Sequence, residues 1–149
     1  ILEEDGEGFY FYRTHESKGM LARLPIFNQL SVSSALFDRL KEIIPILKPD
    51  ILHAHSPALN GLAGVRAAQH FGLPLVYEIR AFWEDAAVDH GSCKEGGLRY
   101  RLTRALETYV IKQASSVTKI CAGLSQDIDA RGIALSNVTV IPNADDIEK

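Results

Sequence analysis

The apolar positions of this chain change their spacing between residues 28 and 142. From residue 28 to 47 they recur every three or four places, which predicts a helix. Pro45 is expected to kink or end this helix because proline has no N–H to donate. Short apolar runs, by contrast, predict strands at residues 9–13, 51–55, 73–80, 116–121 and 138–142.

Three further helices are predicted between these strands. Ser56 is expected to cap the first one, with Pro57 in its first turn and Gly72 ending it. The second spans residues 98–114, and its predicted buried face consists of Leu98, Leu102, Leu106, Tyr109 and Val110. The third covers about residues 124–131 and ends at Gly132.

Strands that alternate with helices through short turns predict right-handed crossovers and a parallel sheet. The predicted fold class is therefore α/β: an open Rossmann-like sheet with helices on both faces, in three layers. Ligands of such sheets bind beyond the carboxyl ends of the strands. This rule selects residues 53–56, the segment from Glu78 into the loop after Arg80, and residues 121–125 and 142–146.

Composition narrows the class of protein. The chain has 149 residues, the size of one domain, with 46% hydrophobic and 23% charged residues, as in an average globular protein. A net charge of −3 argues against nucleic-acid binding, which needs a basic face. Gly-x-Gly-x-x-Gly, Walker-type and Gly-x-Ser-x-Gly motifs are absent from the sequence. Because the chain begins with Ile1 rather than Met, we expect it to be a processed or excised piece.

Two histidines at the end of a predicted strand are the first candidates for chemistry. His53 and His55 are two residues apart, so their side chains share one face of the strand. Zinc needs a third and usually a fourth ligand, and no further His/Cys cluster supplies one, so no metal is expected. His53 is expected to pack within the sheet layer. His55, at the strand tip, is either a base for a hydroxyl or a packing residue.

The connection at residues 81–97 is longer than the roughly two to six residues usual in α/β folds. It carries Trp83, Glu84 and Asp85, a combination suited to a sugar, because carboxylates accept hydrogen bonds from hydroxyls and an aromatic ring covers a sugar face. A solvated loop anchored by Trp83 is the alternative. Arg80 either binds a phosphate or carboxylate or forms an ion pair with Glu84.

Several segments together resemble a known family. Residues 49–55 (Pro-Asp-Ile-Leu-His-Ala-His), Glu107 before residues 114–118, and residues 138–146 are similar to the N-terminal half of family 4 glycosyltransferases of the GT-B fold. Residues 77–85 are similar to a subgroup associated with exopolysaccharide and exosortase loci. The resemblance covers most of the chain, and the order and spacing of the motifs make it specific.

The resemblance implies a metal-independent, retaining transfer of a sugar from a nucleotide-sugar donor to a hydroxyl of a glycan or lipid-linked acceptor, with no cofactor. Residues 1–149 would be a partial N-terminal domain on the acceptor side of the cleft, inactive without a C-terminal nucleotide-sugar domain. No strongly basic amphipathic helix stands out in the sequence, so we expect a cytoplasmic protein, with peripheral membrane association left open. The residues that would be catalytic are His55, Glu84 and Asp85, and those that would bind substrate are Arg80, Trp83 and Asn143.

The sequence departs from the family pattern at several places. Many relatives carry histidine at the strand tip where this chain has Arg80, and Ala144 replaces the glycine of Pro-Asn-Gly-x-Asp. The glycine-rich loop after the family's first strand is missing. Because that first strand is expected to be missing too, we expect an unpaired sheet edge where it would sit, and self-association through this edge. Two alternatives stay open: a non-catalytic α/β module that binds a polyol or phosphorylated ligand, and a nucleotide-sugar epimerase of the same fold.

Overall fold

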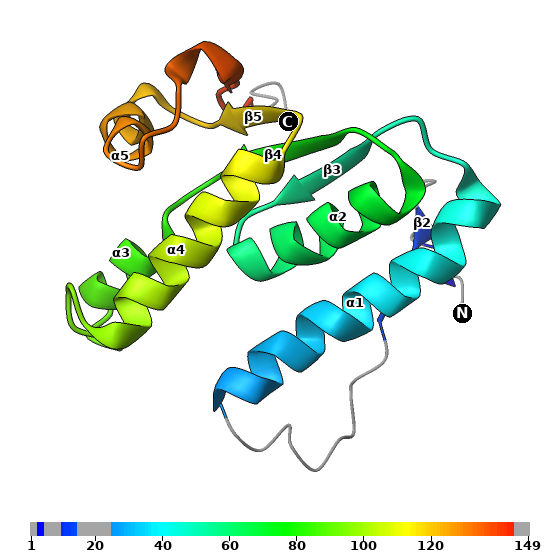
Figure 1. Ribbon diagram of the computed structural model, residues 1–149, viewed down its shortest axis with the longest axis horizontal. Coiled ribbons are helices and arrows are strands. Elements are labelled where there is room, and N and C mark those ends of the chain that lie inside the picture. Colours follow the sequence, from blue (N-terminus) through cyan, green and yellow to red (C-terminus); the bar gives the residue numbers. More distant parts are fainter. Residues whose placement is uncertain (1–2, 5–9, 15–24, 145–149) are drawn as a thin grey trace, which may run out of the picture.

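The computed structural model describes residues 3–4, 10–14 and 25–144 (Figure 1). The strands and helices carry the predicted alternation. In chain order they are β1 (Glu3–Glu4), β2 (Tyr10–Phe11), α1 (Pro25–Leu47), β3 (Leu52–His55), α2 (Ala58–Phe71), β4 (Leu75–Ile79), α3 (Trp83–Asp89), α4 (Leu98–Gln113), β5 (Ser116–Lys119), the 3-10 helix η2 (Ala122–Leu124), α5 (Ser125–Asp129), the 3-10 helix η3 (Leu135–Asn137) and β6 (Val138–Val140).

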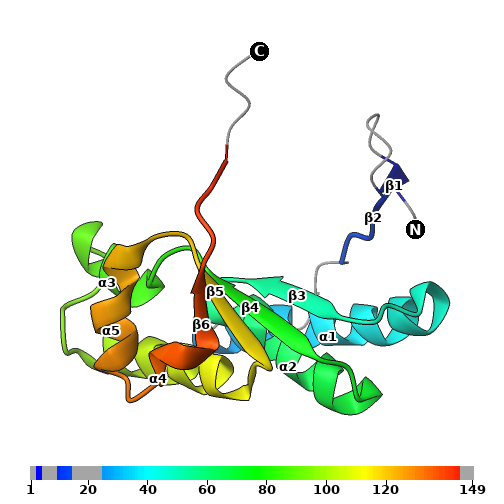
Figure 2. The ribbon, with the colours of Figure 1, turned by 90° about the horizontal axis from the view of Figure 1, so that it is seen from above.

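Four parallel strands form the sheet, in the order β3-β4-β5-β6, and β1 pairs with β2 in a separate antiparallel pair. The predicted Rossmann-like α/β fold is confirmed. When successive strands add in one direction, right-handed crossovers place the connecting helices on the same face of the sheet. Helix α2 packs against β3 and β4, and both α1 and α4 pack against α2. Figure 2 shows these helices together below the strands.

The hydrophobic core lies between the sheet and these helices. Along β4 the buried side chains alternate with partly exposed ones, so that Leu75, Tyr77 and Ile79 face the helices. Val76 and Glu78 therefore face the opposite side of the sheet. The core cluster is completed from the other elements by Ala58, Val65, Ala68, Phe82, Val110, Ile111, Val117 and Ile128.

The ends of α1 and α2 follow the predictions in part. Gly72 ends α2 in the left-handed conformation, with φ 66°, as predicted. The N-cap of α2 is Pro57 rather than Ser56, because the Ser56 hydroxyl accepts a hydrogen bond from the Arg80 N–H, at 3.0 Å, instead of capping the helix. Pro45 lies inside α1, which continues to Leu47.

The predicted buried face of α4 is wrong in part. Val110 is buried and Leu106 packs against the core, as predicted, but Leu98, Leu102 and Tyr109 are exposed. The helix also buries Glu107 and Ile111, which were not predicted. A polar contact accompanies this difference between the predicted and the observed face of α4. The Tyr77 hydroxyl donates a hydrogen bond to Glu107 Oε1, at 2.6 Å, which stabilises Glu107 in its buried position.

Other boundaries also differ from the predictions. Residues 81–97 are not a plain loop, because they contain α3. The predicted helix at residues 124–131 is the shorter α5, preceded by η2. Within the strand predicted at residues 9–13 only β2 is observed, and Phe9 lies outside the described residues, as do Asp145 and Asp146 of the last candidate segment.

Close packing between α2, β4 and α4 makes Gly61 a sensitive position. A Cβ atom added there would lie 2.4 Å from Val110 Cγ1 and 2.7 Å from Tyr77 Cε2. We expect Gly61→Ala to lower the free energy of unfolding by about 1–3 kcal/mol, despite the better helix propensity of alanine. Urea denaturation measures the change. Gly123→Ala is the matched control, because its Cβ would meet only Cys121 Sγ, at 3.8 Å. Equal losses in both variants would contradict the packing argument.

Candidate functional site

The candidate site lies where β3 and β4 end. The parallel register places His53 opposite Val76 and His55 opposite Glu78. Because alternate residues of a strand share a face, both histidines and Glu78 lie on the side of the sheet turned away from α2 and α4. The predicted common face of His53 and His55 is confirmed.

Glu78 is the centre of this group. Its Oε2 lies 3.3 Å from His53 Nε2, and its Oε1 lies 3.3 Å from His55 Nδ1 and 3.8 Å from Arg80 Nε. The two imidazole rings stack with their centroids 4.5 Å apart. The side chains of His53, His55 and Arg80 are about half exposed, and that of Glu78 is 20% exposed. The prediction that His53 packs within the sheet layer is therefore wrong.

Glu78 was not assigned a role in the sequence analysis. A glutamate inside an otherwise apolar strand was the available signal, but only the register of β4 on β3 shows what the carboxylate faces. Arg80 contacts this carboxylate and not that of Glu84, so the suggested Arg80–Glu84 ion pair is wrong.

Helix α3 brings the acidic and aromatic candidates beyond the end of β4. Trp83, the first residue of α3, is 48% exposed. Glu84 is completely buried and forms an ion pair with Arg131, whose guanidinium carbon lies 3.8 Å from the centroid of the Phe82 ring. In this structure the Glu84 carboxylate therefore faces α5 and the core, whereas Trp83 faces solvent.

Asp85 points in another direction, since successive residues of a helix are turned by about 100°. Its Oδ1 accepts a hydrogen bond from the Tyr100 hydroxyl of α4, at 2.8 Å. This hydrogen bond to a carboxylate raises the pKa of Tyr100. Asp85 is partly exposed, so part of its carboxylate remains accessible to a ligand.

Asn143 stands apart from the other candidates. It is exposed and follows β6 in the segment that leaves the sheet (Figure 2). Within the described part of the chain, no hydrogen bond or ion pair joins Asn143 to His55, Arg80 or Asp85.

Comparisons with known proteins show the family to which this chain belongs. The family model described as glycosyl transferase 4-like domain matches residues 5–144. The chain belongs to this family. No curated protein matches it. None of the helices that the structure describes in this glycosyl transferase 4-like domain is long and apolar enough to span a membrane.

On the helix side of the sheet, the glycosyl transferase 4-like domain buries a second polar group. Tyr77 and Glu107 are both inaccessible to solvent, and besides the Tyr77 hydroxyl the Ala58 N–H acts on the Glu107 carboxylate and lowers its pKa. Burial raises the pKa of Glu107 to about 7, a rise that the nearby Glu84 carboxylate strengthens and that the Tyr77 hydrogen bond and Arg131 oppose. Burial and the Glu107 carboxylate also raise the pKa of Tyr77.

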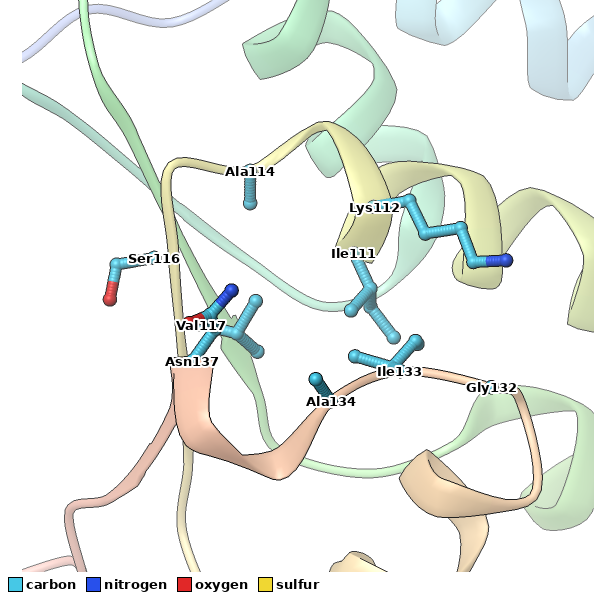
Figure 3. Close-up of a pocket in the computed structure, with 9 residues that line it drawn as sticks. All are labelled: Ile111, Lys112, Ala114, Ser116, Val117, Gly132, Ile133, Ala134 and Asn137. Carbon is cyan, nitrogen blue, oxygen red and sulfur yellow. The ribbon is translucent and has the colours of Figure 1, made fainter.

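The domain also has a shallow pocket of about 200 Å³, but at the other end of the sheet (Figure 3). It lies at the start of β5, between the end of α4 and the loop after α5. Ligands of parallel α/β sheets bind at the opposite, carboxyl ends of the strands. The pocket is lined by Ile111, Lys112, Ala114, Ser116, Val117, Gly132, Ile133, Ala134 and Asn137. With one peripheral lysine as its only ionisable side chain, it is not our candidate site.

Proposed function

We propose that this chain forms the acceptor side of the cleft in a glycosyltransferase that moves a hexose from a nucleotide-sugar to a hydroxyl of a glycan or lipid-linked acceptor. Membership of the glycosyl transferase 4-like domain family supports the reaction class. The observation that carries the proposal is the His55–Glu78–Arg80 group at the carboxyl ends of β3 and β4, followed along the chain by Trp83 and Asp85.

In this proposal His55 acts on the acceptor hydroxyl. Its Nδ1 faces the Glu78 carboxylate at 3.3 Å, which leaves Nε2 for the substrate. A carboxylate at one ring nitrogen orients the imidazole and holds a proton on that nitrogen, so that the other nitrogen can accept a hydrogen bond. With half of its side chain exposed, His55 can reach a hydroxyl brought to the edge of the sheet.

The neighbouring residues would bind the acceptor. Arg80 presents a guanidinium to a phosphate or carboxylate, Trp83 offers a ring face to a sugar, and Asp85 accepts a hydrogen bond from a hydroxyl. Asn143 is assigned to the passage toward the donor-binding domain, which the family resemblance implies. Transfer is proposed to need no metal and no cofactor.

Glu84 has a different role in this proposal. Its buried ion pair with Arg131 holds α3 against the turn that follows α5, so Glu84 positions Trp83 and Asp85 and does not touch the substrate.

Exopolysaccharide synthesis in the cytoplasm, at the inner face of the membrane, is the setting we propose from the resemblance of residues 77–85.

The proposal is tested with the intact protein that carries this chain. We expect His55→Asn to lower the transfer rate about 10²–10⁴-fold, the range for loss of a general base. Asp85→Asn is expected to lower it about tenfold, the effect of about 1.4 kcal/mol of lost transition-state binding. The assay follows labelled sugar moving from a set of nucleotide-sugars to glycan and lipid-linked acceptors.

The matched control is His90→Asn, an exposed histidine directly after α3. It is expected to transfer at the wild-type rate, and circular dichroism checks that every variant is folded. Wild-type rates in both His55→Asn and Asp85→Asn would refute the site. Binding of a polyol or phosphorylated ligand without transfer would favour the binding module, and a rearranged nucleotide-sugar formed without acceptor would favour the epimerase.

A further inference from the structure

We propose that His53, His55 and Glu78 form a binding site for a divalent transition-metal ion, best suited to Zn²⁺. One ligand atom from each residue lies within 4.8 Å of the others. Two of the residues come from β3 and the third from β4, so no spacing pattern in the sequence groups them. The expectation of no metal rested on a missing third ligand, and Glu78 supplies one.

The distances place the three side chains around one point. His53 Nε2 lies 3.3 Å from Glu78 Oε2, and His55 Nδ1 lies 3.3 Å from the other carboxylate oxygen, Oε1. Two ligand atoms about 2.0–2.1 Å from a tetrahedral zinc ion are about 3.3–3.4 Å apart. Neighbouring ligands of an octahedral ion at the same bond length are only about 3.0 Å apart. A tetrahedral ion would therefore draw the three ligand atoms, which lie within 4.8 Å of one another, to this spacing as the two rings turn.

The ligand types point to the same class of ion. Imidazole nitrogens suit Zn²⁺ and other borderline transition metals, whereas Mg²⁺ and Ca²⁺ prefer oxygen ligands throughout. Two histidines and one glutamate leave a fourth position open, as in zinc sites that keep a bound water. The open position would face solvent here, because about half of each histidine side chain is exposed.

The backbone holds the ligands in place. His53 and His55 lie within β3, which pairs with β4 along its full length. Just beyond the last pair, the Ser56 N–H donates a hydrogen bond to the Glu78 carbonyl, at 2.9 Å. Ligands on paired strands lose little conformational freedom when an ion binds, which favours affinity.

Arg80 competes with the ion for Glu78. Its Nε lies 3.8 Å from Glu78 Oε1, and its positive charge opposes a cation nearby. Replacing Arg80 by glutamine should therefore increase the affinity for the metal. An increase in metal affinity would support a specific site, because a substitution that damaged the fold could only lower the affinity.

The experiment measures metal binding by the intact protein, with both cysteines replaced (Cys93→Ser and Cys121→Ser) to remove thiolate ligands. Co²⁺ is the spectroscopic probe, because its visible absorbance is intense in tetrahedral sites, and Zn²⁺ is added to displace it. We expect one ion per chain. The titration is done at about pH 7.5, where imidazoles are free to bind metal.

Three substitutions test the ligands: His53→Ala, His55→Ala and Glu78→Gln. Each should weaken Co²⁺ and Zn²⁺ binding more than about 100-fold, because even an outer-shell partner is worth about 10–100-fold. Arg80→Gln should strengthen binding severalfold. His90→Ala, which removes an exposed histidine outside the site, should leave the affinity unchanged.

The proposal is overturned if no Co²⁺ binds, if the absorbance is that of an octahedral ion, or if the three ligand variants bind like the wild type. An ion held through His55 Nδ1 and Glu78 would take the place of the proton that the proposed function puts on that nitrogen, so the two proposals use the same groups in different ways. They are tested separately, because the readout here is metal binding and not sugar transfer. A protein that transfers sugar without binding Zn²⁺ would refute this site alone, and the opposite result would refute the transferase alone.

Discussion

Replacing Arg131 by methionine should lower the free energy of unfolding by about 3–5 kcal/mol, because it leaves the Glu84 carboxylate buried without its counter-ion. Neither side chain has any exposed surface. Arg131 Nη1 also donates to the Arg104 carbonyl and to Thr108 Oγ1, both at 3.4 Å, so the substitution also removes a link between α4 and the turn after α5. Methionine keeps most of the volume and the contact with Phe82.

A double variant separates the lost ion pair from lost packing. Arg131→Met with Glu84→Leu removes both charges and should recover most of the stability, since apolar replacements of a buried ion pair are often neutral. Arg101→Met, on the exposed side of α4, is the matched control and should change stability by less than about 0.5 kcal/mol. Urea denaturation at neutral pH provides the values. A double variant as unstable as Arg131→Met would show that packing, not charge, is responsible.

The second large effect is a dependence of stability on pH that comes from Glu107. Its pKa is about 7 in the folded protein, against an ordinary value of 4.5. Between these values the folded state holds a proton that the unfolded state has lost, so stability falls as pH rises. We expect the free energy of unfolding to decrease by about 3 kcal/mol from pH 4.5 to above pH 7, and Glu107 to add no further change beyond that.

Glu107→Gln should remove this component. The glutamine carbonyl can still accept the Tyr77 hydrogen bond, and no charge has to be buried at high pH. The variant is therefore expected to be more stable than the wild type at about pH 8 and close to it at about pH 5. Denaturation from about pH 5 to 8 measures the difference in free energy of unfolding between the variant and the wild type. The contributions of histidines are common to both proteins and therefore cancel in this difference.

Glu42→Gln is the control for this experiment, because Glu42 pairs with Arg39 on the surface of α1. Its profile should follow the wild type within about 0.5 kcal/mol. Two ionisable groups besides Tyr77 act on Glu107, namely Glu84 and Arg131. If the Glu107→Gln profile kept the wild-type slope, Glu107 would not be the source of the pH dependence.

These two buried groups also explain how the candidate site is supported. The Glu84–Arg131 pair anchors α3, whose first residue is Trp83. The Tyr77–Glu107 hydrogen bond lies under β4, the strand that carries Glu78 on its other face. These buried polar contacts therefore support the site from the helix side of the sheet.

Much of the fold was predictable because its signals are local. Apolar spacing revealed the four sheet strands and the helices between them, and Gly72 marked the end of α2. Helix α3 was missed because seven residues are too few for a clear helical period. Leu98 and Leu102 misled the assignment of the α4 face, because apolar residues are also common on protein surfaces.

The sequence by itself determined the α/β class, the family resemblance and the common face of His53 and His55. These features depend on the spacing of residues close together in the chain, such as the alternation of faces along a strand. Only the tertiary structure decided that Glu78 stands between the two histidines, since the register of neighbouring strands depends on packing distant in the chain. It also decided that Glu84 is buried while Asp85 is partly exposed. Glu84 and Asp85 are adjacent carboxylates in one short helix, and only the position of Arg131, in the turn after α5, distinguishes their surroundings.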